Sequence, residues 1–134
     1  MHIVAFDFAR KQERTLGPGE RPAPAESGVF HWIVAAPDEA ARLPELLGGL
    51  GVSPAAAAQL QEPQPEALYE LHDDAIHFTL TEARIDGRTL KSGVVAGLLG
   101  ARFFVTLAPT DSPLLDKMRR LYREDLLQFA RSSG

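Results

Sequence analysis

Residues 29–39 read Val-Phe-His-Trp-Ile-Val-Ala-Ala-Pro-Asp-Glu, and this stretch decides the fold. β-Branched and aromatic residues fill its first part, which predicts a buried strand over residues 29–35. Pro37 then suits the first turn of a helix, and Asp38 and Glu39 complement the positive charge at a helix N-terminus. A buried strand that runs directly into a helix indicates a sheet with helices packed against it.

Two helices are predicted after this strand. The first has leucines at helical spacing, and glycines weaken and end it. These residues are Leu43, Leu46, Leu47 and Leu50, with Gly48, Gly49 and Gly51. Ser53 then serves as an N-cap and Pro54 as a first-turn proline for a short second helix, which ends near Gln61, before two prolines.

Strand patterns flank this core on both sides. Residues 1–8 alternate between two faces, and a short partner strand is expected through Thr15 and Leu16. A loop rich in proline and glycine follows over residues 17–28. Later strands are predicted over residues 67–72, 75–81, 92–99 and 102–107, with turns at Asp73-Asp74 and Asp86-Gly87.

The clearest element is a C-terminal helix over residues 112–131, which begins at Ser112-Pro113. Its apolar stripe consists of Leu114, Leu115, Met118, Leu121, Tyr122 and Leu126. Its basic face consists of Lys117, Arg119, Arg120 and Arg123. This basic run is either a solvated helix face or a contact with another subunit or a membrane-proximal surface.

The order of elements predicts the fold class. Strands, a helix pair, several strands and a final helix indicate an α/β (α+β) domain. We expect a mixed sheet of about six or seven strands with helices packed on both faces, an α/β/α sandwich. The 134 residues suit a single domain over residues 1–134.

Composition excludes several function classes. The formal net charge of −4 argues against a nucleic-acid or anionic-membrane binder, and the lack of cysteine excludes disulfides, thiolate zinc sites and cysteine nucleophiles. The longest apolar run, residues 93–101, is far shorter than the ~20 residues of a membrane helix, and no signal peptide is visible. We therefore expect a soluble chain with no direct membrane insertion.

A small group of polar residues is the candidate metal site. His72, Asp73 and Asp74 lie close to His77, and histidine and carboxylate ligands suit zinc. The alternative is a polar turn between two strands, which would point His72 and His77 to different faces. His31 lies in an apolar strand and is expected to be an interior histidine. No serine elbow or phosphate loop is visible, so we expect that the chain is not an enzyme.

Motifs along most of the chain, taken in order, resemble those of the cytoplasmic N-terminal domain of the CorA family of divalent-cation transporters, which includes the ZntB branch. Each motif is weak alone, and their order and spacing carry the resemblance. They are Phe30-His31-Trp32-Ile33-Val34, Pro37-Asp38-Glu39, Leu50-Gly51-Val52-Ser53-Pro54, the segments 62–70 and 73–80, Leu99-Gly100-Ala101-Arg102-Phe103-Phe104-Val105-Thr106-Leu107, and Leu115-Asp116-Lys117-Met118-Arg119.

The resemblance implies a regulatory or assembly domain on the cytoplasmic face of the inner (plasma) membrane. In the family, this domain leads through a stalk helix to a membrane pore with a Gly-Met-Asn loop, and the full protein is a homopentamer that carries Mg²⁺ or another divalent ion. This chain lacks the Gly-Met-Asn signature. Its expected partners are therefore the pore half of the same protein and further copies of itself. The alternative is a stand-alone ion-sensing or protein-interaction module.

The chain departs from the family at the position of its regulatory cation. Where many members have Glu-Asp in the short second helix, this sequence has Ala58-Gln59, and the family's histidine before proline is Ser53. Mg²⁺ prefers carboxylate ligands. A regulatory Mg²⁺ or Zn²⁺ is implied by the resemblance, but Gln59 is a poor ligand for it.

Overall fold

A seven-stranded mixed sheet forms the middle layer of the molecule, with strand order β2-β1-β3-β7-β6-β5-β4. The computed structural model describes residues 1–17, 19–22, 28–61, 68–71, 75–109 and 111–132. Among the described strands, β3 and β7 alone pair in parallel, and every other neighbouring pair is antiparallel. The strands are β1 His2–Asp7, β2 Gln12–Thr15, β3 Val29–Ala35, β4 Leu68–Leu71, β5 Ala75–Asp86, β6 Thr89–Gly100 and β7 Phe103–Leu107.

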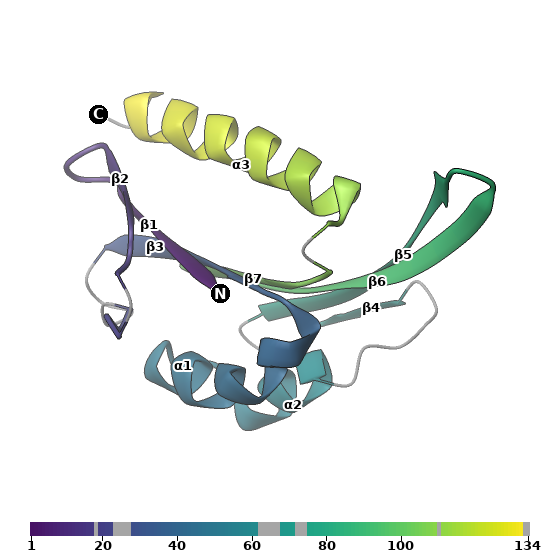
Figure 1. The fold of residues 1–134 in the computed structure, drawn as a ribbon. Coiled ribbons are helices and arrows are strands. Elements are labelled where there is room, and N and C mark those ends of the chain that lie inside the picture. The colour runs from purple at the N-terminus through teal and green to yellow at the C-terminus, as the bar shows by residue number, and fades with distance from the viewer. Residues whose placement is uncertain (18, 23–27, 62–67, 72–74, 110, 133–134) are drawn as a thin grey trace.

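Helices cover both faces of this sheet, as the sequence predicted (Figure 1). Helix α3 lies over one face, and α1 and α2 lie over the other. The helical elements are the 3₁₀ helix η2 Pro37–Arg42, α1 Leu43–Gly49, α2 Pro54–Gln61 and α3 Pro113–Ser132. The observed architecture is therefore the α/β/α sandwich.

The first helical segment differs from the single helix that was predicted to begin at Pro37. Residues 37–42 form a 3₁₀ helix, and the amide of Leu43 donates to the carbonyl of Ala40. Pro44 follows, and because it has no N–H it cannot donate an α-type bond to that carbonyl. The α-helical geometry therefore begins only at Leu43. The predicted cap of α2 is confirmed, since Ser53 Oγ accepts the amide of Ala56 at 3.3 Å.

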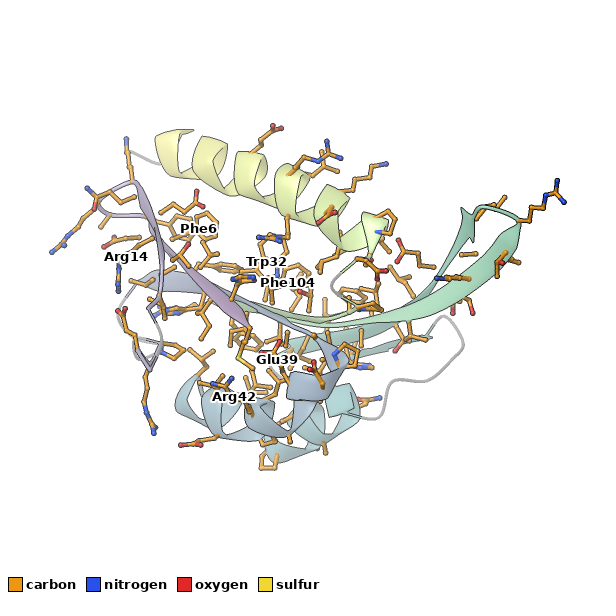
Figure 2. All side chains as sticks on the ribbon, viewed as in Figure 1. Phe6, Arg14, Trp32, Glu39, Arg42 and Phe104 are labelled. Carbon is orange, nitrogen blue, oxygen red and sulfur yellow. The ribbon has the colours of Figure 1, made fainter. Side chains whose placement is uncertain are left out.

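Strict alternation along β3 produces two separate cores. Ile33 points to the α1–α2 side, while Trp32 points to the α3 side. Figure 2 shows Phe6, Trp32 and Phe104 on the side that α3 covers and Glu39 on the opposite side. Each helical layer therefore buries one face of the same strands.

The β5–β6 hairpin is longer than predicted, because each strand has 12 residues. Its turn uses Gly87 with φ of 64°, which agrees with the predicted Asp86-Gly87 turn. Among the described residues, β4 pairs with residues 76–79 of β5, and β7 pairs with residues 96–99 of β6. Beyond these residues the hairpin is a two-stranded ribbon that projects from the body of the sheet (Figure 1).

Some predictions fall partly or wholly outside the described residues. The Asp73-Asp74 turn lies outside them, as do residues 18 and 23–27 of the predicted loop. The described residues of that loop form neither helix nor strand. Among the described helices, none has the length and apolar character needed to cross a membrane.

Candidate functional site

A cleft of about 820 Å³ lies beside α3, where the helix passes over β1, β2 and β3. Its apolar lining comes from the sheet, and its charged lining comes from β2 and α3. The described residues that line it are Val4, Phe6, Glu13, Thr15, Trp32, Asp116, Arg119, Arg120 and Glu124. The cleft therefore combines a hydrophobic floor with walls of both charge signs.

The floor of the cleft is held by aromatic packing and one buried hydrogen bond. The ring of Trp32 packs against Phe104 with centroids 5.3 Å apart, and its Nε1–H donates to Thr106 Oγ1 at 3.2 Å. Phe6 meets Phe30 edge to face, at 6.5 Å. Because an indole N–H needs a partner when it is buried, Thr106 fixes the orientation of Trp32.

The start of α3 is fastened to the sheet by Glu82 of β5. Ser112 Oγ donates to Glu82 Oε2 and the amide of Leu114 donates to Glu82 Oε1, both at 2.6 Å. Ser112 Oγ also accepts the amide of Leu115 at 3.1 Å, so Ser112 caps the helix at the start that the sequence predicted. Glu82 adds a negative charge at the positive end of the helix.

The basic run on α3 is exposed and lies along the cleft. Arg119 and Arg120 line the cleft, and Lys117 is exposed nearby on the helix. Asp116 and Glu124 line the same cleft. The side chain of Arg123 lies outside the described part of the chain. Because acidic and basic groups alternate here, this surface is not a uniform anion-binding patch.

Most of the predicted metal ligands lie outside the described residues, so their grouping stays a prediction. Gln59 is half-buried on α2 beside the exposed Ala58, while His72, Asp73 and Asp74 lie outside the described residues. Among the residues that the structure does describe, no three or more histidines and carboxylates gather in a way that could hold a metal ion. One neutral amide next to an alanine does not fit a Mg²⁺ site.

The histidine of β3 is interior, as predicted. His31 is buried on the sheet face that α1 and α2 cover. Burial lowers its pKa below the ordinary value of 6.5, and the nearby charge of Arg14 lowers it further. His31 is therefore a neutral core residue, and we assign it no ligand role.

Sequence reasoning found some of these residues and missed others. Ser112, Arg119 and Arg120 follow from the helix pattern of residues 112–131. Glu82 gives no local signal, because its partner Ser112 is 30 positions away. The role of Glu13 in the cleft likewise depends on the packing of α3 over β2.

Comparisons with known proteins address the fold. No protein-family model matches the sequence, and no curated protein matches it. Solved structures do match. The full-length CmaX protein has 12% identity and a TM-score of 0.66, over 90% of this chain and 38% of that one. The ZntB cytoplasmic domain from Vibrio parahaemolyticus RIMD 2210633 has 13% identity and a TM-score of 0.62, over 92% of this chain and 50% of that one.

A third structure extends the same likeness. The CorA magnesium transporter from Methanocaldococcus jannaschii has 12% identity and a TM-score of 0.61, over 92% of this chain and 37% of that one. This chain thus spans half or less of each of the three solved chains. None of them is described as an enzyme, and the lack of catalysis stays a prediction here. The chain has the fold of a CorA/ZntB-type cytoplasmic domain, as its sequence motifs predicted.

Proposed function

We propose that this chain is the cytoplasmic regulatory or assembly domain of a CorA-like transporter of Mg²⁺ or another divalent cation. One observation carries the proposal: a fold shared with CorA and ZntB structures over 92% of the chain. The domain would lie on the cytoplasmic face of the inner membrane and work with a pore-forming part of the same protein. Its other partners would be further copies of itself, in a homo-oligomer.

The position of α3 supports this role. The helix is anchored at its start by Glu82 and Ser112 and then runs 20 residues across the sheet. A helix held in this way can pass a movement of the sheet to whatever follows it in the protein. The cleft beside α3 would widen or narrow with such a movement.

A transport assay on the complete reading frame tests the proposal. We expect the whole protein, reconstituted in liposomes, to take up Mg²⁺, Co²⁺, Ni²⁺ or Zn²⁺. Deletion of residues 1–134 should leave the pore sequence intact but abolish either assembly or the control of uptake. A reading frame that ends near Gly134 and encodes no membrane helices would contradict the proposal and favour a stand-alone sensing or interaction module.

The regulatory cation is a separate prediction, and we expect this chain not to bind Mg²⁺ specifically at α2. Ala58 supplies no ligand and Gln59 supplies a neutral amide, so the thermal midpoint should be equal in MgCl₂ and in NaCl of the same ionic strength. A specific ligand at 100 times its Kd would add about 2.7 kcal/mol to the free energy of unfolding. A rise that EDTA reverses would contradict this expectation.

The same titration with Zn²⁺ tests the second candidate group. A stabilisation by Zn²⁺ that His72→Ala abolishes would assign a site to His72, Asp73 and Asp74. Equal midpoints with and without Zn²⁺ would leave these residues as a polar turn.

A further inference from the structure

The far end of the β5–β6 ribbon, residues 83–92, stands away from the rest of the molecule, and we call it the ribbon tip. Beyond residues 76–79 and 96–99, the two strands pair only with each other among the described strands. The ribbon then runs out from the body of the sheet to the turn at Gly87 (Figure 1). A flat surface that approaches from this side therefore meets the tip before it meets the body.

One face of the ribbon carries no charged residue. Strand alternation and the register place on it the facing pairs Thr81 and Val94, Ala83 and Ser92, and Ile85 and Leu90. Ile85 and Leu90 are the pair nearest the turn, and they are 77% and 70% exposed. Nearer the body, the same face buries His77 and Leu98, where α2 contacts both strands. The face that α2 covers in the body therefore continues uncovered to the tip.

The ribbon tip is basic, although the chain as a whole is acidic. Residues 83–92 contain three basic residues and one acidic residue, a net charge of +2 in a chain whose total is −4. Arg88 is exposed in the turn, and no salt bridge joins it to a described residue. Lys91 is exposed one position from Leu90, so it lies on the opposite face of the strand. The tip is therefore amphipathic, with aliphatic side chains on one face and basic groups on the other face and at the turn.

This arrangement of faces suits a lipid bilayer. An element that lies in a membrane interface buries its aliphatic face at the boundary of headgroups and acyl chains, and its basic residues lie on the opposite, polar face. Long basic side chains can bend back toward the lipid phosphates while their stems stay against apolar surface. The attraction to anionic lipid also extends over about 8 Å at physiological ionic strength, so a basic group need not touch the membrane to contribute. A flat protein partner would instead contact only one of the two faces.

We propose that the ribbon tip docks on the anionic headgroup layer of a membrane, with Ile85 and Leu90 inserted among the lipids. The inference rests on the proposed function, which puts the domain on the cytoplasmic side of a membrane, and it names the surface that touches that membrane. The cytoplasmic leaflet carries anionic lipids that attract basic residues. The net charge of −4 still argues against membrane binding by the body, so the contact is confined to the tip and is weak and reversible.

The aliphatic part of the contact is tested by cosedimentation of the 134-residue chain with lipid vesicles. We expect binding to vesicles of equal parts phosphatidylglycerol and phosphatidylcholine, weaker binding as salt rises, and little binding to phosphatidylcholine alone. Ile85→Ser together with Leu90→Ser should weaken the binding at least about tenfold, since two aliphatic side chains lose their burial. Leu121→Ser is the matched control and should bind as the wild type does, because Leu121 is a 53% exposed aliphatic residue on α3.

The basic part is tested by two variants of equal net charge. Arg88→Glu and Lys117→Glu each make the chain more negative by two charges, but Arg88 lies at the tip and Lys117 lies on α3. Arg88→Glu should weaken binding to the phosphatidylglycerol vesicles at least about fivefold. Lys117→Glu should weaken it less than about twofold, because a charge far from the surface is screened.

A fluorescent reporter tests the depth of the tip. Trp32 is the only tryptophan and is buried, so Leu90→Trp adds a second indole whose emission responds to its surroundings. We expect this emission to shift to shorter wavelength when phosphatidylglycerol vesicles are added, because the indole leaves water. Leu121→Trp is the control on α3, and its emission should not shift.

Three outcomes would overturn the inference. They are no binding to phosphatidylglycerol vesicles at low salt, equal binding by the wild type and the Ile85→Ser/Leu90→Ser variant, and an unshifted emission of Leu90→Trp on bound vesicles. Self-association that the double serine variant abolishes, without vesicle binding, would assign the tip to a second copy of the chain. A chain that binds no vesicle, while its full reading frame transports cations, would remove this inference and leave the proposed function standing.

Discussion

A glycine makes room for the aromatic packing under α3. The ring of Phe78 lies directly over Gly97, so that a Cβ built at position 97 would come within 2.1 Å of it. Phe78 in turn meets Phe104 at 6.1 Å, and Phe104 meets Trp32. Gly97 therefore supports a row of three aromatic rings that reaches the floor of the cleft.

Gly97→Ala should destabilise the protein. The added methyl group would overlap the ring of Phe78, and a shift of this ring would disturb its contact with Phe104. We expect a loss of roughly 1–3 kcal/mol in the free energy of unfolding, the usual cost of overpacking a core. Urea denaturation followed by tryptophan fluorescence measures it, because Trp32 is the only tryptophan.

Gly93→Ala is the control on the same strand and the same face. A Cβ there would lie 3.6 Å from Pro109, an ordinary contact. This variant should be neutral or slightly stabilising, because alanine restricts the unfolded chain more than glycine does. If both variants lost the same free energy of unfolding, the replacement of a strand glycine, and not overlap with the Phe78 ring, would be the cause.

At the scale of elements, α3 depends on a strand that is distant in sequence. Its N-cap Ser112 is bonded to Glu82, and Glu82 lies opposite Gly93 at the base of the β5–β6 ribbon. The hydrogen bonds from Ser112 and Leu114 to Glu82 therefore link the ribbon to the start of α3, and we call this contact the Glu82 joint.

Glu82→Gln should loosen the start of α3. Glutamine keeps the size of the side chain but has no charge, and its NH₂ group replaces one of the two oxygens that accept from Ser112 and Leu114. Because hydrogen bonds to charged groups contribute about 1.5–3 kcal/mol, we expect a loss of that order or less. Hydrogen exchange should show faster exchange in the first turns of α3 than in β3.

Glu45→Gln provides the matched comparison. The Glu45 side chain is 74% exposed and pairs with Arg21 on the surface, so its loss should change the free energy of unfolding by less than about 1 kcal/mol. If both variants exchange equally fast in α3, the joint at Glu82 does not control the helix.

At the scale of the whole molecule, one core contains a buried titratable group. His31 lies in the α1–α2 core, and burial lowers its pKa. In the unfolded chain His31 returns to its ordinary pKa and binds a proton more readily. Protonation therefore favours unfolding below the ordinary pKa of histidine.

We expect the free energy of unfolding to fall as pH decreases below about 6.5, the ordinary pKa of histidine. The fall should stop once the pH lies below the lowered pKa of the folded protein. His31→Gln should reduce this slope, even though the variant is less stable at every pH. An unchanged slope would assign the effect to other groups, and His2→Gln, at an exposed position, is the control.

Much of this architecture is predictable from local pattern. Strand β3 begins and ends where the sequence predicted, because residues 29–35 combine β-forming side chains with a proline-marked helix start. The cap at Ser53 and the helix start at Ser112-Pro113 are equally visible. In each case, the residues from which the strand or helix start was predicted are also the residues that form it.

The rest depends on residues that meet only in the folded chain. The ribbon was predicted too short, with strands that stopped at residue 81 and resumed at residue 92, although residues 82–86 alternate between charged and aliphatic side chains as a strand does. The cleft joins β2 to α3, about a hundred positions apart, and Glu82 meets Ser112 across 30 positions. Gln59 could be placed on a helix from sequence, but its surroundings could not.

The place of β7 has a consequence for the synthesis of the chain. β7 is the central strand that joins β2-β1-β3 to β6-β5-β4, yet it is the last strand to leave the ribosome. The indole N–H of Trp32 donates to the hydroxyl of Thr106, which is synthesised 74 residues later, so this hydrogen bond cannot form until then. Non-local pairing of this kind is slow. Until β7 has left the ribosome and paired, the two half-sheets have open inner edges, which can pair with a neighbouring chain.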